Sequence, residues 1–156
     1  MRSKGFGLLR ILLVASFACY SLVLVYLLFM MHAGPGYGSN MTIGEYIRNC
    51  TNLIPFKTIS TYIRAFSDHS MNMDIPIRNL LGNLLMFLPM GLYLPGFFKR
   101  LRKLGAFCIC MVVLIFVIEA TELMIRRGSF DIDHFILKMG GELIGFALWR
   151  GIHSAW

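Results

Sequence analysis

Long apolar segments alternate with polar segments along this chain of 156 residues. A transmembrane helix needs about 20 mostly apolar residues to cross a hydrocarbon core of roughly 30 Å. Residues 11–31 hold no charge, and this run exceeds the roughly 7–15-residue core of a cleaved signal peptide, so we expect it to be retained. Four segments reach or approach the required length, and we predict transmembrane helices over residues 9–31, 79–98, 104–125 and 132–149.

The composition strengthens this interpretation. Hydrophobic residues make up 57% of the chain and charged residues only 15%, whereas about 25% is usual for soluble domains. A soluble domain of this length would need more polar residues to cover its core. We therefore expect an all-α integral membrane bundle of four transmembrane helices, forming one domain over residues 1–156. Its predicted location is the cell membrane, as a multi-pass protein surrounded by membrane lipids.

The basic residues predict the orientation of the bundle, since loops rich in Lys and Arg face the cytoplasm. The formal net charge is +7. Basic residues without acids flank the first apolar run at Arg2, Lys4 and Arg10, and they fill the turn Lys99–Lys103. Both termini are thus expected in the cytoplasm, with a long outer loop over residues 32–78. No basic face carries an aromatic base-stacking pattern, so no nucleic-acid partner is predicted.

The outer loop contains two predicted short helices. Thr42 and Glu45 have the spacing of a capping box, which predicts a helix over Ile43–Asn49. Apolar residues recur at helical spacing within Thr58–Phe66, so one face of that segment is apolar. Such an amphipathic helix either lies on the outer membrane surface or covers the bundle. Its apolar residues are Ile59, Tyr62, Ile63 and Phe66.

Charged residues inside the last two apolar segments are the candidates for function. Glu119, Glu122, Lys138 and Glu142 interrupt runs of apolar residues. A charge in hydrocarbon is costly, so such residues usually face a protein interior or a polar cavity. Helical spacing places these charges and several loop-end residues at similar depths in the outer half of the membrane. The predicted polar pocket consists of Asn79, Asn83, Glu119, Glu122, Arg126, Asp131, Asp133, Lys138 and Glu142.

Two interpretations of this constellation stay open. In the first, the residues form a structural network in which Lys138 pairs with Glu142, and Glu119 or Glu122 bonds to Asn83 or Arg126. In the second, they line an outward-open pocket that binds a headgroup, a cation or a lipid-linked substrate. Five acids against three bases between residues 119 and 142 exceed what pairing requires, which favours the pocket.

The pocket residues also allow two sharper hypotheses. Asp131, Asp133 and His134 could join Glu119 and Glu122 around a divalent cation, but no ligand spacing enforces this, so neither a metal nor a cofactor is predicted. Paired carboxylates could act as general acid and base, which makes a membrane enzyme the alternative function. The chain has no Ser-His-Asp pattern, no phosphate-binding glycine loop and no HExxH sequence, so no catalytic residue is assigned.

Four stretches of the chain form a distinctive set of motifs. They are Asn52-Leu-Ile-Pro55-Phe56, the helix pattern Asn79-x-x-x-Asn83-x-x-x-Phe87-x-Pro89-x-Gly91, Glu119-Ala-Thr-Glu122, and Ser129-Phe130-Asp131-Ile132-Asp133 followed by Gly140, Gly141 and Gly145. Together these motifs resemble the VanZ-like family. The likeness covers roughly residues 50–149. It implies a multipass bacterial membrane protein that lowers susceptibility to teicoplanin-type glycopeptides, with a cell-wall precursor or a lipoglycopeptide as the expected ligand.

The chain departs from the family pattern at three positions in the predicted pocket. Glu122 stands where the family usually has Gln, His134 where it has Asp, and Lys138 where it has Asn. Two of these changes introduce opposite charges. We therefore expect Glu122 and Lys138 to replace a pair of amides with an ion pair.

Overall fold

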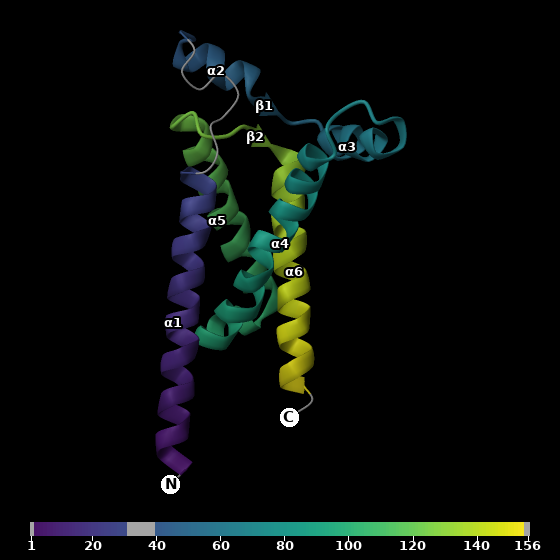
Figure 1. Cartoon of the computed structure of the whole chain (residues 1–156). Coiled ribbons are helices and arrows are strands. Elements are labelled where there is room, and N and C mark those ends of the chain that lie inside the picture. Colours follow the sequence, from purple (N-terminus) through teal and green to yellow (C-terminus); the bar gives the residue numbers. More distant parts are fainter. Residues whose placement is uncertain (1, 31–39, 155–156) are drawn as a thin grey trace.

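The computed structural model describes residues 2–30 and 40–154, and within these ranges the chain is almost entirely helical (Figure 1). Four long helices form the body, and two short helices and the two strands lie at one end of it. In chain order the elements are α1 (Arg2–Phe29), α2 (Ile43–Asn49), β1 (Thr51–Asn52), α3 (Lys57–Asp68), α4 (Asp74–Phe97), the 3-10 turn η1 (Lys99–Arg102), α5 (Leu104–Met124), β2 (Phe130–Asp131) and α6 (Ile132–Ser154).

Three of the described helices are long and apolar enough to cross a membrane. These candidate spans are Arg10–Phe29 in α1, Asp74–Phe97 in α4 and Leu104–Met124 in α5. They confirm the helical membrane character expected from the sequence. Helix α6 has the necessary length, but it is not among these spans and carries Lys138 and Glu142 in its middle.

Helices α4 and α6 extend beyond the predicted transmembrane segments. Helix α4 begins at Asp74 rather than at residue 79, and α6 continues to Ser154 rather than ending at residue 149. The charges at Arg78 and Arg150 mark where an uncharged run stops, but a helix continues beyond that point at no penalty in a polar environment. Pro76 also fits the first turn of α4, since the N–H groups there have no acceptor within the helix.

Glycines bring α4 and α6 into close contact. A Cβ atom placed on Gly141 would overlap the carbonyl oxygen of Leu84, and one on Gly145 would overlap that of Leu88. On the opposite helix, a Cβ on Gly91 would overlap the carbonyl oxygen of Glu142. The small-residue face at Gly141 and Gly145 therefore allows close helix packing.

Helix α1 packs against the other helices along its second half. Leu24 and Leu28 are buried in a cluster with Phe87 of α4 and Ile115 of α5. The Tyr20 hydroxyl donates a hydrogen bond of 2.7 Å to the carbonyl oxygen of Met86. These contacts join three of the long helices in one core.

The predicted capping box of α2 is present. The Thr42 hydroxyl accepts a hydrogen bond from the backbone N–H of Glu45, and the Glu45 carboxylate accepts one from the backbone N–H of Thr42. A short parallel pair of strands follows, in which Thr51 pairs with Phe130 and Asn52 with Asp131. Sequence reasoning did not predict these strands, which tie the segment between α2 and α3 to the connection between α5 and α6.

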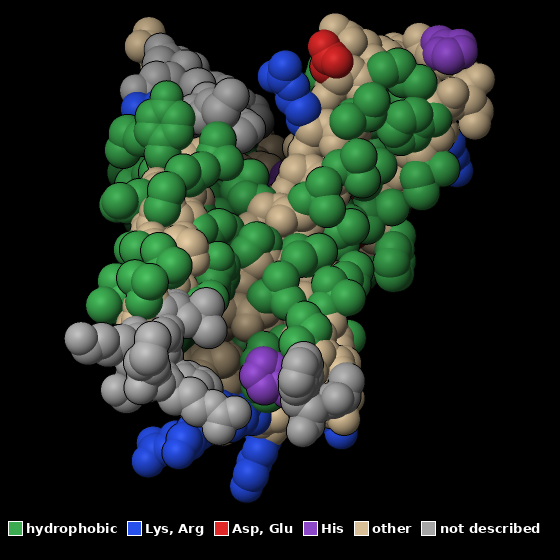
Figure 2. Space-filling view, turned by 60° about the horizontal axis from the view of Figure 1, so that its bottom comes forward, with side chains coloured by type: hydrophobic (Ala, Val, Ile, Leu, Met, Phe, Trp, Pro, Cys, Tyr) green, Lys and Arg blue, Asp and Glu red, His purple; other side chains and the backbone are tan. Residues whose placement is uncertain are grey.

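Apolar side chains cover the sides of the helices. Figure 2 shows hydrophobic side chains over these sides, and Lys and Arg side chains at both the lower and the upper end. The exposed basic residues of the turn after α4 are Lys99, Arg100, Arg102 and Lys103. This distribution suits a protein whose sides contact lipid acyl chains.

Candidate functional site

A buried ion cluster joins α5 and α6. The Lys138 ammonium lies 2.7 Å from Glu119 Oε1 and 3.3 Å from Glu122 Oε2. Only 2% of Lys138, 1% of Glu119 and 9% of Glu122 is exposed. Lys138 also lies 5.3 Å from the centre of the Phe87 ring, within the range of a cation–π interaction. We call Lys138, Glu119 and Glu122 the Lys138 cluster.

Helical geometry explains how this cluster forms. Glu119 and Glu122 are three residues apart on α5, so their side chains share one face. Helical side chains point back toward the N-terminus of their helix, which directs Lys138 of α6 toward the end of α5 that carries both carboxylates. Glu122 and Lys138 contact each other as expected from their opposite charges.

The cluster has more acceptors than donors. Two carboxylates face one ammonium group, which leaves a formal charge of −1 when all three groups are ionised. Glu119 Oε2 is buried and has no hydrogen-bond partner among the described residues. A pairing of charges alone would not require this second carboxylate.

Glu142 lies apart from the Lys138 cluster. Sequence reasoning paired it with Lys138 along α6, but the Lys138 ammonium contacts the two carboxylates of α5 instead. Glu142 is completely buried, and neither of its carboxylate oxygens has a hydrogen-bond partner in the described part of the chain. The predicted Lys138–Glu142 pair is therefore wrong, and Glu142 is a separate buried acid one turn further along α6.

Asp133 has a different role, because it caps α3. Its Oδ1 atom accepts a hydrogen bond from the backbone N–H of Phe56 at 2.5 Å, and its Oδ2 atom accepts bonds from Thr58 at 2.7 Å and Ile59 at 3.0 Å. The free N–H groups at a helix N-terminus favour an anionic acceptor. Asp133 therefore fastens α3 to the start of α6.

Asp131 completes this connection. Its Oδ1 atom accepts hydrogen bonds from the Asn52 amide at 3.2 Å and from the backbone N–H of Asp133 at 2.9 Å, and its Oδ2 atom accepts one from the Thr58 hydroxyl at 2.6 Å. We call Asp131, Asp133, Asn52 and Thr58 the aspartate clasp. Sequence reasoning did not assign Asn52 and Thr58 to the site, although Asn52 belongs to a stretch that resembles the family pattern.

The remaining predicted pocket residues bond elsewhere. The Asn79 and Asn83 amides each donate to a backbone carbonyl of α4, those of Ile75 and Asn79. Arg126 donates to the carbonyl oxygen of Met41 at 2.8 Å. Asn83 and Arg126 therefore donate to backbone carbonyls and not to Glu119 or Glu122 as predicted.

Arg126 follows the end of α5 and adopts a left-handed conformation, with φ of 58°. The backbone N–H groups of Arg126 and Arg127 donate to the carbonyls of Leu123 and Glu122, which is the Schellman pattern of a helix end. The Arg126 guanidinium lies 5.7 Å from the centre of the Tyr46 ring. Burial raises the pKa of Tyr46 to about 12, and its hydroxyl donates to the Gly128 carbonyl. Arg126 thus anchors α2 rather than the Lys138 cluster.

The match of the chain to a protein-family model is decisive for its classification. The model described as VanZ/LLP1 matches residues 17–153. The chain belongs to the VanZ/LLP1 family. The match extends beyond the resemblance found in the sequence, because it includes the second part of α1 from residue 17 onward. No curated protein and no solved structure matches this chain.

The geometry separates the candidate residues of this VanZ/LLP1 protein into distinct groups. The Lys138 cluster and Glu142 lie buried along the long helices, while the aspartate clasp fastens the start of α3 to the start of α6. Within the described ranges, no group of three or more His, Cys, Asp or Glu side chains is arranged to hold a metal ion. The carboxylates of Asp131 and Asp133, proposed from the sequence as cation ligands, accept hydrogen bonds from the protein itself.

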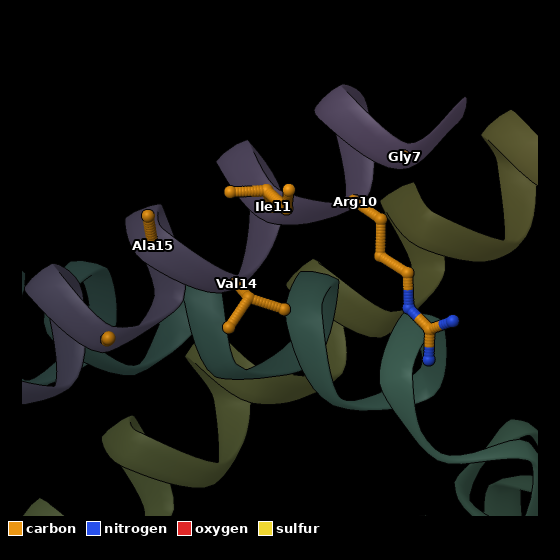
Figure 3. Close-up of a pocket in the computed structure, with 6 residues that line it drawn as sticks. Gly7, Arg10, Ile11, Val14 and Ala15 are labelled. Atoms are coloured by element: carbon orange, nitrogen blue, oxygen red, sulfur yellow. The ribbon is translucent and has the colours of Figure 1, made fainter. Parts of the chain in front are cut away.

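A cavity of about 520 Å³ lies along α1, away from the candidate residues of this VanZ/LLP1 protein (Figure 3). Its lining is apolar except for Arg10, whose side chain extends from α1 in the close-up. The lining residues are Gly7, Arg10, Ile11, Val14, Ala15 and Ala18. None of the predicted pocket residues lines this cavity, so it does not correspond to the expected polar pocket.

Proposed function

We propose that this VanZ/LLP1 protein lowers the susceptibility of the cell to teicoplanin-type glycopeptide antibiotics, and that the Lys138 cluster is its functional centre. Family membership supports the first part of the proposal. The second part rests on one observation, the buried contact of Lys138 with both Glu119 and Glu122. Replacing a buried ion pair with apolar residues is often neutral or stabilising, so such a cluster is poorly explained by stability alone.

The charge of the cluster indicates what it would bind. With two carboxylates and one ammonium, it favours a ligand that brings a positive charge or a hydrogen-bond donor. Glu119 Oε2 is an acceptor without a partner among the described residues, and Glu122 is the most exposed member of the cluster. A cell-wall precursor or a lipoglycopeptide with an amino group or amide N–H groups has this chemistry.

The proposed arrangement has four membrane spans, with α6 as the fourth. Both marked ends of the chain lie at the same end of the bundle in Figure 1, opposite α2 and α3, which supports an even number of crossings. The basic turn Lys99–Arg102 supports a cytoplasmic location for the end where α4 meets α5. The Lys138 cluster would then lie in the outer half of the cell membrane. A single cysteine placed in this turn should resist impermeant thiol reagents in intact cells, and its labelling from outside would reverse the orientation.

The test of the function is a susceptibility profile of cells that express Glu119→Gln. This change keeps the shape of the side chain but removes its charge, so we expect the protection against teicoplanin to fall to the level of cells without the protein. Thr121→Ala is the matched control, because Thr121 lies on the exposed face of α5 two residues away. Vancomycin is measured in parallel, and membrane abundance is checked by immunoblotting.

Two results would contradict the proposal. If cells with the Glu119→Gln variant keep full protection against teicoplanin at the membrane abundance of the wild-type protein, the Lys138 cluster is not the functional centre. Equal susceptibility of cells with and without the wild-type protein would remove the resistance function itself.

The paired carboxylates of the cluster also suit acid–base chemistry on a lipid-linked or cell-surface substrate, the alternative named from the sequence. Muropeptides and envelope lipids from cells with wild-type protein, Glu119→Gln and no protein distinguish the two functions. A covalent product that requires Glu119 would favour an enzyme. Protection without any such product favours a binding protein.

A further inference from the structure

An exposed apolar surface lies beside the aspartate clasp, at the start of α3. The turn before α3 exposes 64% of Leu53, 61% of Ile54 and 61% of Phe56. Helix α3 adds Ile63 and Phe66, which are also exposed. We call these five residues the apolar shelf. Contiguous exposed apolar residues mark sites that contact a membrane, a ligand or another protein.

The shelf is distinct from the side of α3 that packs on the bundle. Ala65 is completely buried, and Thr58 and Tyr62 beside it are half-buried, so this side faces the other helices. Ile63 and Phe66 lie on a neighbouring side that nothing in the described chain covers. The sequence allowed this helix either to cover the bundle or to lie on the membrane surface. Contact with the bundle accounts for only one side of α3.

The position of α3 places the shelf next to the lipid-facing surface of α4. Helix α3 extends sideways from the upper end of the bundle in Figure 1, and α4 begins six residues after α3 ends. The first half of α4, a candidate membrane span, continues the exposed apolar surface with Ile75, Ile77 and Leu81. The shelf and this surface thus form neighbouring parts of one apolar exterior.

Polar residues border the shelf on its other side. Thr61 and Arg64 are exposed, and Thr61 lies about 160° around the helix from Ile63 at 3.6 residues per turn. The exposed Lys57 stands at the start of the helix. An apolar face with Lys and Arg at its border is the pattern of a helix that lies in the plane of a membrane interface.

We propose that the apolar shelf inserts into the lipid interface at the end of the bundle opposite the turn Lys99–Arg102, as a membrane anchor held by the aspartate clasp. The occupant of the shelf is the phospholipid surface itself, because the shelf continues the lipid-facing exterior of α4. Asp133 links this anchor to α6, because its carboxylate, at the start of α6, accepts hydrogen bonds from the first turn of α3. The anchor thereby fixes the depth at which α6 begins.

The experiment measures tryptophan fluorescence in proteoliposomes that contain phosphatidylcholine brominated on its acyl chains. Ile63→Trp places the probe on the shelf, and Thr61→Trp places it on the polar face of the same helix. Both positions are exposed, so neither change disturbs a buried contact. The signal of the parent protein, which contains Trp149 and Trp156, is subtracted. Phe66→Trp provides a second shelf probe if Ile63→Trp expresses poorly.

We expect brominated lipid to quench the tryptophan at position 63 several-fold more strongly than the one at position 61. Equal and weak quenching at both positions would overturn the proposal. Weak quenching at position 63 together with a signal that changes with protein density would assign the shelf to a second protein copy, which also overturns it. The result does not depend on drug susceptibility, so it is separable from the test of Glu119.

Discussion

The close contact between α4 and α6 gives a sharp stability prediction at Gly141. In Gly141→Ala the added Cβ would overlap the carbonyl oxygen of Leu84 and lie 2.9 Å from its carbonyl carbon. Both atoms belong to the backbone, so no side-chain rotation relieves the contact. Since carbon atoms pack at about 3.5–4.0 Å, the two helices would have to separate by roughly 1 Å.

The expected magnitude follows from two opposing effects. Overpacking a well-packed interior costs about 1–3 kcal/mol, and the loss of contact between α4 and α6 places Gly141→Ala in this range. Alanine is favoured over glycine in a helix by about 1 kcal/mol, which offsets part of the cost. Because the overlapping atoms of Leu84 belong to the backbone, we expect a cost in the upper part of this range, about 2–3 kcal/mol. The net loss is then about 1–2 kcal/mol, or roughly 2–8 °C in thermal midpoint.

Gly82→Ala is the matched control. Gly82 lies inside α4, and a Cβ placed on it meets nothing within 4 Å. This variant should therefore gain up to about 1 kcal/mol from helix propensity alone. The thermal midpoints of both variants are measured on detergent-purified protein, with size-exclusion chromatography reporting the fraction that stays folded at each temperature. A midpoint for Gly141→Ala at or above that of the parent would refute the close packing of α4 on α6.

Three other predictions test the ion cluster, the clasp and the cap of α2. Lys138→Asn alone removes the ammonium that both buried carboxylates contact and should cost about 3–5 kcal/mol. Addition of Glu122→Gln should restore part of this loss in a double-mutant cycle measured by thermal unfolding, and additive effects would refute the coupling. Asp133→Asn weakens a charge-assisted cap and should speed proteolysis within α3, whereas an unchanged cleavage rate would show that the clasp is dispensable. Hydrogen bonds from Thr42 lower the pKa of Glu45, so the stability that Glu45 gives α2 is present above the ordinary pKa of 4.5 and lost as pH falls through the lower folded value. Hydrogen exchange in α2, corrected for its intrinsic pH dependence, should show this loss, and Glu45→Gln should abolish it.

Sequence patterns predicted the elements whose cause is local. The capping box of α2 lies within four residues, and the structure reproduces the predicted range Ile43–Asn49. The start of α4 was placed five residues late, because hydropathy reports where a segment leaves the lipid and not where its helical hydrogen bonds begin. The pairing of β1 with β2 involves residues about 79 positions apart, such as Asn52 and Asp131, and a two-residue strand has no periodicity to reveal it.

The partners of the buried charges were the least predictable part. Spacing along α6 makes Glu142 a possible neighbour of Lys138, but it is equally consistent with a lysine that reaches the next helix. The outcome depends on how closely α5 and α6 approach, and one sequence does not contain that distance. The Lys138 ammonium lies 2.7 Å from Glu119 Oε1. This contact follows from the tertiary packing of α5 against α6 and not from the spacing of residues along either helix.

The buried acids differ in whether their carboxylate oxygens accept hydrogen bonds, and this difference separates the structural acids from the candidates for function. All four carboxylate oxygens of Asp131 and Asp133 accept hydrogen bonds from the protein, so none of these oxygens is without a partner. Glu119 and Glu142 are also buried, yet they retain acceptor atoms without partners in the described ranges. A buried acceptor left unsatisfied costs about 1–3 kcal/mol, a penalty that structural packing alone has no reason to keep. The proposed function therefore rests on the Lys138 cluster, with Glu142 as a further candidate, while the two aspartates hold α3 against the start of α6.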